Sequence, residues 1–478
     1  MSSRHLPVVL ALVAVLAGLA LVDVADPPPA HFGAAGAFAM PVADPPSALS
    51  STWFCAAGAG TAGSGSGLVV LAANRSDRTR TGTVTWYPAG SAPVARPVTV
   101  PPFQGVSLDA DDAVDAEEVS AVVELDGGGV GVEHLVRTDG GSSVSPCASS
   151  ASDRWYLANG TTARDATQVL VLFNPFPDDA IVDIAFATDQ GRDEPEALQG
   201  LPVPSGTTTR VNVGDVVRRR EVTATTVATR SGRVVVDRLQ RFDESDGRSG
   251  ISLALAAPAP AEVWTFPAGE HQEGLVERWH VYNPADRDAV VLLEVVPDEG
   301  EAPIPFERTV SAHSQLVIDA AETAPAPPGV GHSSTVRSIN GVSVVAEREL
   351  SGTAPSPRRG WSSMLGSPLA AASWLLPAGE GASAVADRLV VHNPSAQTVR
   401  FSVIPLDGDP AAVAAGAGGG RGEFELGPAQ RRELEVGDLV EPSPVPLVVS
   451  ADGPVVVERD LSPTDRAGIS TVLGIPLP

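Results

Sequence analysis

The sequence repeats a pattern of strand, turn and strand four times along its 478 residues. In each copy, apolar residues at alternate positions flank a turn that begins with asparagine, which is typical of a β-hairpin. The turn asparagines are Asn74, Asn174, Asn283 and Asn393. They lie 100, 109 and 110 residues apart. A period of this length predicts an array of four similar units.

Three further markers recur in the same phase as the turn. A tryptophan precedes each hairpin, at Trp53, Trp155, Trp264 and Trp374. An acid on a valine-rich segment follows it, at Glu133, Asp237, Glu347 and Glu458, and the next residue is His134, Arg238, Arg348 or Arg459. A Gly-x-Ser closes each unit, beginning at Gly141, Gly250, Gly360 and Gly468. Markers that keep one phase exclude a chance repeat.

We expect β repeats at 51–150, 151–258, 259–370 and 371–478, after a signal segment at 1–25 and a Pro/Ala-rich spacer at 26–50. About eight short antiparallel strands in roughly 105 residues is the size of an immunoglobulin-like β-sandwich. An all-β chain of four tandem sandwiches is therefore the expected fold class. The alternative is one closed, propeller-like toroid. Each unit has its own tryptophan and its own Gly-x-Ser, which favours separate sandwiches.

The first residues are typical of an export signal. Arg4 is followed by an apolar run from Leu6 to Val22, which predicts one N-terminal membrane helix. An anchor in the plasma membrane is the preferred interpretation, and secretion after cleavage is the alternative. Both place the repeats outside the cytoplasm. Because that compartment is oxidising and the first repeat holds the only two cysteines, Cys55 and Cys147 are expected to form a disulfide.

The net charge of −26 argues against nucleic-acid binding, which requires a basic surface. All 32 basic residues are arginine. Together with abundant alanine and glycine, this bias is typical of a GC-rich bacterial genome.

The repeated motifs support a family resemblance. They are Trp-x-x-(Ala/Pro)-(Ala/Asn)-Gly, the Asn-Pro hairpin and Val-(Glu/Asp)-Arg. Together they resemble an uncharacterised family of exported actinobacterial proteins with a domain of unknown function. They are also similar to the roughly 110-residue repeats of large secreted bacterial proteins that carry a Trp-Tyr-Phe-x-(Glu/Pro)-Gly signature. The first repeat departs from the pattern at Arg75 and His134. The resemblance implies architecture and location, and no catalytic residue.

The sequence contains no recognisable catalytic or metal motif. Cys-x-x-Cys, His-Glu-x-x-His and calcium-hand loops are missing, so no cofactor, metal or catalytic residue is assigned. A carboxylate on a valine-rich strand could act as a general acid, but four copies would then mean four equivalent sites. We expect instead that each repeated acid accepts hydrogen bonds from backbone amides or an arginine between units.

These observations favour a non-enzymatic protein of the cell envelope that binds or scaffolds an unknown envelope protein or wall polymer. One alternative is a carbohydrate-binding protein for a wall polymer. That function would need exposed aromatic residues, whereas aromatics make up 5% of the chain and the repeated tryptophans fall at core positions. The other alternative is an enzyme with an unrecognised site.

Overall fold

A computed structural model describes residues 39–58, 67–138, 141–245, 248–299, 304–323, 329–377, 385–408, 422–440, 445–463 and 468–478. The apolar segment expected to be a signal or anchor, at 1–25, lies outside the described residues. Within the described part of the chain, no helix is long and apolar enough to cross a bilayer.

Unit 1 is a sandwich of two antiparallel sheets. Its strands are β1 (Ser51–Cys55), β2 (Leu68–Asn74), β3 (Arg80–Pro88), β4 (Val94–Val100), β5 (Gln104–Asp109), β6 (Val119–Leu125), β7 (Val130–Thr138) and β8 (Gly141–Pro146). One sheet has the order β1-β6-β3-β4 and the other β5-β2-β7-β8. Val123 of β6 and Val132 of β7 lie in the core between the sheets, whereas Val122 and Val136, on the opposite faces of the same strands, belong to the core of unit 2.

The other units repeat this arrangement, except that in unit 4 one long strand, β31 (Leu447–Pro463), belongs to both sheets and joins them. Unit 2 contains β9 (Arg154–Leu157), β10 (Ala166–Asn174), β11 (Ala180–Thr188), β12 (Gly191–Asp193), β13 (Leu201–Val203), β14 (Thr207–Asn212), α2 (Val213–Val216), β15 (Thr223–Ser231), β16 (Val235–Asp243) and β17 (Ser249–Leu255). Unit 3 contains β18 (Val263–Glu270), β19 (Leu275–Asn283), β20 (Ala289–Pro297), β21 (Phe306–Val310), β22 (Ser314–Asp319), α3 (Ala320–Thr323), β23 (Gly331–Ser338), β24 (Val345–Gly352) and β25 (Gly360–Leu365). Unit 4 contains β26 (Ala371–Leu376), β27 (Val385–His392), β28 (Val399–Pro405), β29 (Glu423–Leu426), β30 (Arg431–Glu435), α5 (Val436–Leu439), β31 (Leu447–Pro463), β32 (Ser470–Leu473) and β33 (Ile475–Pro476). Two short 3-10 turns are η2 (Ala110–Asp112) in unit 1 and η3 (Glu196–Leu198) in unit 2.

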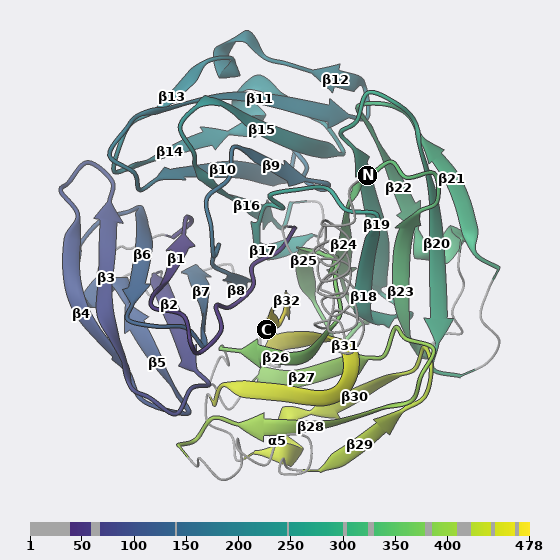
Figure 1. Ribbon diagram of the computed structural model, residues 1–478. Helices are drawn as coiled ribbons and strands as arrows, with labels where there is room; N and C mark the ends of the chain where they lie inside the picture. Colours follow the sequence, from purple (N-terminus) through teal and green to yellow (C-terminus); the bar gives the residue numbers. More distant parts are fainter. Residues whose placement is uncertain are drawn as a thin grey trace, which may run out of the picture.

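The four units lie side by side in a closed ring (Figure 1). Both sheets of a unit run from the periphery towards the centre (Figure 1); the sheet whose last strand, β8, β17, β25 or β32, reaches the centre is called the inner sheet, and the other is called the outer sheet. The expectation of four β-sandwich repeats is confirmed, and no unit takes a strand from another among the described residues. The four sandwiches also form a closed ring, as expected for the alternative of a toroid, so the structure has a feature of each expectation.

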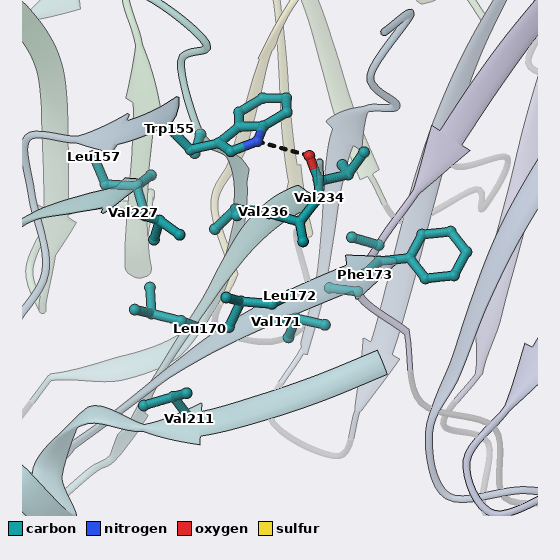
Figure 2. Close-up of a cluster of buried hydrophobic side chains, with 14 of the residues drawn as sticks. Trp155, Leu157, Leu170, Val171, Leu172, Phe173, Val211, Val227, Val234 and Val236 are labelled. Atoms are coloured by element: carbon teal, nitrogen blue, oxygen red, sulfur yellow. Dashed lines mark hydrogen bonds between the residues drawn. The ribbon is translucent and has the colours of Figure 1, made fainter. Parts of the chain in front are cut away.

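Each hydrophobic core continues into the neighbouring unit. The core of unit 2 includes Trp155 and Leu172 (Figure 2). It also contains Ala57 and Val122 of unit 1. The core of unit 1 contains Leu375 and Ile475 of unit 4. Burial of apolar surface at the junctions therefore holds the ring together as it holds each sandwich together.

The repeated tryptophans are core residues. All four are at most 1% exposed. The indole Nε1 of Trp155 donates a hydrogen bond to the carbonyl of Val234 at 2.8 Å (Figure 2). Trp264 makes the same bond to Val344 at 2.8 Å, and Trp374 to Val455 at 2.9 Å. Buried indoles usually have such an acceptor, but Trp53 Nε1 has none among the described residues. These rings therefore offer no exposed platform for stacking on a sugar.

The turn asparagines lock the hairpins. All four side chains are fully buried. In unit 4, Asn393 Nδ2 donates to the carbonyls of Gln397 at 2.7 Å and Leu426 at 3.1 Å, and Asn393 Oδ1 accepts the Ser395 amide hydrogen at 3.0 Å. The other three asparagines make the same set of bonds. One side chain thus joins the turn to the strand packed beneath it.

Replacing Asn393 by alanine is expected to lower the free energy of unfolding by about 1–3 kcal/mol, because it leaves buried carbonyls without a donor. Urea denaturation measures the change. Gln397→Ala is the matched control, since its side chain is exposed on the same turn and only a few tenths of a kcal/mol are expected. Equal stability of the two variants would contradict the assigned role of Asn393.

Residues 39–46 were expected to belong to the spacer at 26–50, but several of them are buried against the ring. Ala39, Pro41 and Ala43 are buried, and the Ala43 amide donates to the Pro476 carbonyl at 3.0 Å. Ala39 to Pro41 also cover an apolar space of about 50 Å³ between the four inner strands. This part of the chain is therefore a component of the ring. The physical reason is its apolar composition, which favours burial once a hydrophobic centre is available.

Candidate functional site

The repeated acids lie at the junctions between units. Glu133, Asp237, Glu347 and Glu458 are fully buried on the inner-sheet strands β7, β16, β24 and β31. Three of them accept a hydrogen bond from a backbone amide of the preceding unit, four residues after its tryptophan. Asp237 accepts from Ala57 at 2.8 Å, Glu347 from Asn159 at 3.1 Å, and Glu458 from Ala268 at 3.2 Å. Glu347 accepts a second bond, from the Ala158 amide at 2.8 Å.

The basic residues after the first three acids face the next unit. His134 Nε2 lies 3.1 Å from Asp237 Oδ2. Arg238 Nη1 lies 2.8 Å from Glu347 Oε2. Arg348 binds both carboxylate oxygens of Glu458. Neighbouring residues of a strand point to opposite faces, so the acid reaches back to one neighbour while the base reaches forward to the other.

The junction between units 4 and 1 is only partly described. The amide that corresponds to Ala57 and Ala268 belongs to residue 378, which lies outside the described residues, so the contact of Glu133 with it is not described. Arg459 binds Asp387 of its own unit through Nε at 2.8 Å and Nη2 at 2.6 Å. Arg348 has the equivalent partner in its own unit, with Nε 3.9 Å from Glu277 Oε1.

The Gly-x-Ser motifs close the ring at its centre. Each inner sheet ends in an edge strand, which has a neighbouring strand on one side only. The Gly-x-Ser serine of one unit contacts the edge strand of the next unit. Ser143 Oγ accepts from the Leu253 amide at 2.9 Å, Ser252 Oγ from the Ser363 amide at 3.2 Å, and Ser470 Oγ from the Val144 amide at 2.9 Å. Ser362 Oγ lies 2.9 Å from Thr471 Oγ1. The four contacts run from unit 1 to 2, 2 to 3, 3 to 4 and 4 to 1.

The glycine of this motif allows the close approach of the strands. Gly360 has a φ of 132°, and a Cβ there would lie 2.9 Å from the Cα of Gly468. A side chain at this position would therefore clash with the backbone of the next unit and strain its own backbone.

The two cysteines are joined within unit 1. Their sulfur atoms lie 2.05 Å apart, between β1 and the residue after β8. His134 Nδ1 lies 3.3 Å from Cys147 Sγ, so the imidazole is held between the disulfide and Asp237. Cys55, His134 and Cys147 place their donor atoms within 4.8 Å of one another. Since both sulfurs are in the disulfide, they are not available as thiolate metal ligands.

A second set of buried charged residues was missed by sequence reasoning. Near the junction of units 2 and 3, Glu349 lies 2.8 Å from His280 Nε2 and 3.3 Å from Asn159 Nδ2. Burial opposes ionisation of Glu349, but the hydrogen bond and charge of His280 outweigh it and lower the pKa of the carboxyl to about 2. Near the junction of units 3 and 4, Asp460 binds Arg358 and Arg388. These residues do not recur in every unit, so the repeat gave no signal for them.

Burial of His392 predicts a loss of stability in mild acid. Its side chain is 3% exposed, and burial lowers the pKa of the imidazole to about 4. Its contribution is complete above the unfolded pKa of about 6.5 and is lost as pH falls from there towards 4. The free energy of unfolding should decrease by about 3 kcal/mol in this window.

The measurement is urea denaturation at several pH values for the wild type and for His392→Gln. The variant should show a smaller decrease between pH 6.5 and 4, because it has no titrating group at this position. Identical pH profiles would show that His392 does not carry the effect.

The middle of the chain matches a known protein family. Residues 135–321 match DUF5719, a family of unknown function. This region covers the end of unit 1, all of unit 2 and much of unit 3. The DUF5719 match fits an uncharacterised family, as the sequence motifs indicated, and it assigns no activity. No curated protein matches the chain.

Solved structures give only local or weak similarity. The Anabaena sensory rhodopsin transducer is 22% identical over 18% of this chain and 94% of its own, with a TM-score of 0.17. A Thermotoga maritima protein, 1070, is 18% identical over 22% of this chain and 93% of its own, with a TM-score of 0.20. A tetra-tandem repeat from the extending region of a large adhesion protein is 10% identical over 89% of this chain and 99% of its own, with a TM-score of 0.09. Similarities at this level carry no functional argument.

Proposed function

We propose that the protein is a non-enzymatic, extracytoplasmic protein of the cell envelope that binds or scaffolds another envelope component. The proposal rests on the contacts that the repeated acids, basic residues and serines make with neighbouring units. Three of the repeated acids, the basic residues beside Asp237 and Glu347, and all four Gly-x-Ser serines contact a neighbouring unit. Groups that would be candidates for catalysis in the sequence thus assemble the ring.

Location is supported by the sequence. The apolar run after Arg4 is typical of an export signal, and the joined Cys55 and Cys147 suit an oxidising compartment. Anchoring by this segment would hold the ring at the plasma membrane, and cleavage would release it. Either way the ring meets envelope proteins and wall polymers.

The charge constrains the kind of partner. A net charge of −26 repels anionic surfaces and attracts basic protein patches. Binding to a basic partner should therefore weaken as salt is raised from 0.05 to 0.5 M, because the Debye length falls from roughly 14 to 4 Å.

Cross-linking in intact cells, followed by purification of the full chain in detergent and mass spectrometry, tests the proposal. An envelope protein or a wall polymer should be captured reproducibly. Capture of neither, together with turnover of a substrate by the purified chain, would overturn it.

A further inference from the structure

A polar groove lies at the junction of units 3 and 4. Its floor is the outer sheet of unit 3, from Thr265 of β18, Thr335 of β23 and Val296 of β20. Its wall is the Asn393 hairpin of unit 4, with His392. The groove holds about 410 Å³, and a second hollow of about 280 Å³ continues past Val296. Volumes of this size suit a small ligand or a side chain of a partner.

At the junction of units 1 and 2, the corresponding space is filled by aromatic rings. Phe173, which precedes the turn asparagine of unit 2, packs on Tyr87 of β3 with ring centroids 5.0 Å apart. Phe176, two residues after that asparagine, packs on Phe54 at 5.9 Å. These are edge or tilted contacts between rings, which stabilise beyond their buried area.

None of these four phenylalanine and tyrosine side chains has a phenylalanine or tyrosine counterpart at the junction of units 3 and 4. Counting from the tryptophan and asparagine markers, the counterparts of Phe54 and Tyr87 are Thr265 and Val296, and those of Phe173 and Phe176 are His392 and Ser395. Smaller side chains on both the floor and the wall leave the groove open. The opening is therefore a property of this junction and is not shared with the aromatic one.

The junction of units 2 and 3 indicates which chemical group the floor of the groove can bind. There Tyr282 precedes the turn asparagine, and its hydroxyl lies 2.8 Å from Thr226 Oγ1. Thr226 pairs with Tyr156, the residue after Trp155, and Thr335 pairs with Thr265, the residue after Trp264. Thr335 is thus the counterpart of Thr226. In unit 3 the same threonine lines the open groove.

We propose that this groove binds an aromatic side chain, a tyrosine above all, presented by a partner polypeptide. The ring would lie over Val296 and Thr265, where rings lie at the first junction, and its hydroxyl would bond Thr335. The inference rests on the proposed function and names the site and the chemistry of the partner.

The groove surroundings agree with a neutral ring carrying one hydroxyl. Thr265, Thr335 and Ser333 supply hydroxyls. His392 Nδ1 lies 3.2 Å from the Gln430 carbonyl oxygen, so the imidazole is already partnered by the protein. The charged groups nearby are paired: Arg337 with Glu294 at 3.9 Å on the floor, and Arg431 with Asp298 at 2.8 Å in the second hollow. A charged ligand would have to compete with these pairs.

The test uses the purified full chain in detergent and two probes, N-acetyl-Gly-Tyr-Gly-amide and its alanine counterpart, followed by NMR of the isotope-labelled protein. The tyrosine peptide should perturb signals of the groove residues, and the alanine peptide should not. Val296→Tyr and His392→Tyr should abolish the perturbation, because each fills the groove with a ring that Tyr87 and Tyr282 show the fold to accommodate. Ala396→Tyr, on the exposed tip of the same hairpin, should retain it.

Equal binding of the two peptides, or binding that survives both filling variants, would overturn the proposal. So would perturbation of the groove by chito-oligosaccharide with no response to the tyrosine peptide, which would assign the groove to sugars. Failure of the groove can be separated from failure of the proposed function by cross-linking Val296→Tyr in cells. If the wild type captures an envelope partner and the variant captures it equally, the groove proposal falls and the function stands.

Discussion

Replacing Glu347 by glutamine should lower the free energy of unfolding by about 3–5 kcal/mol, among the largest effects expected from a single substitution in this chain. Glu347 and Arg238 are both fully buried at the junction of units 2 and 3. Glutamine keeps the shape of the side chain and removes its charge. Arg238 would then remain buried without a counter-charge, which costs more than the pair itself contributes.

Urea denaturation of Glu347→Gln measures this effect, and Glu425→Gln is its control. Glu425 pairs with Arg400 at 3.3 Å, but both side chains are more than 60% exposed, so a loss below about 1 kcal/mol is expected. Similar losses for the two variants would contradict a structural role for the buried pair. Loss of partner binding by Glu347→Gln at unchanged stability would show instead that the repeated acids form a binding site.

Replacing both Cys55 and Cys147 by alanine is the second large change, with an expected loss of about 4 kcal/mol. The disulfide closes a loop of 92 residues, and a cross-link over a long loop removes much of the conformational entropy of the unfolded chain. Denaturation of the oxidised wild type and the double variant gives the difference.

The pairing itself is tested by mass spectrometry without reductant. Neither thiol should react with an alkylating reagent in denatured, unreduced protein. Alkylation of both cysteines would refute the disulfide, and the double variant should then be as stable as the wild type.

The repeat made the sandwiches predictable. Positions such as Asn393 and Trp264 recur because each unit needs the same turn and the same core residue, so four copies of one solution are visible in one chain. The expected role of the repeated acids, as acceptors of backbone amides or an arginine between units, agrees with the contacts of Asp237, Glu347 and Glu458.

The partner of each acid could not be predicted. Arg348 could bind Glu347, its neighbour in sequence, or Glu458, which is 110 residues away, and a repeat with one period is compatible with both. Alternation along the strand sends Glu347 and Arg348 to opposite faces. Only the geometry of the ring shows which neighbouring unit each face meets. Burial of Ala39 was equally hidden, since the Pro/Ala composition of its segment suits a spacer as well as a packed strand.

The groove results from positions at which the repeats differ, whereas the fold was predicted from the positions that the repeats share. His392 occupies the position of Phe173 and Tyr282. That replacement is visible in the aligned repeats, but its consequence is not, because the space it leaves also requires Thr265 and Val296 on a different unit.

The hydrogen bond from Val144 to Ser470 has a consequence for how such a protein can evolve. In an open array, each repeat contacts only its neighbours, so copies are gained or lost at little cost and the end copies need polar caps. Here every copy has two neighbours, and no end is available for growth. Adding or deleting one unit would change the angle at all the junctions at once, so the copy number is fixed at four by geometry and can change only if every interface changes with it.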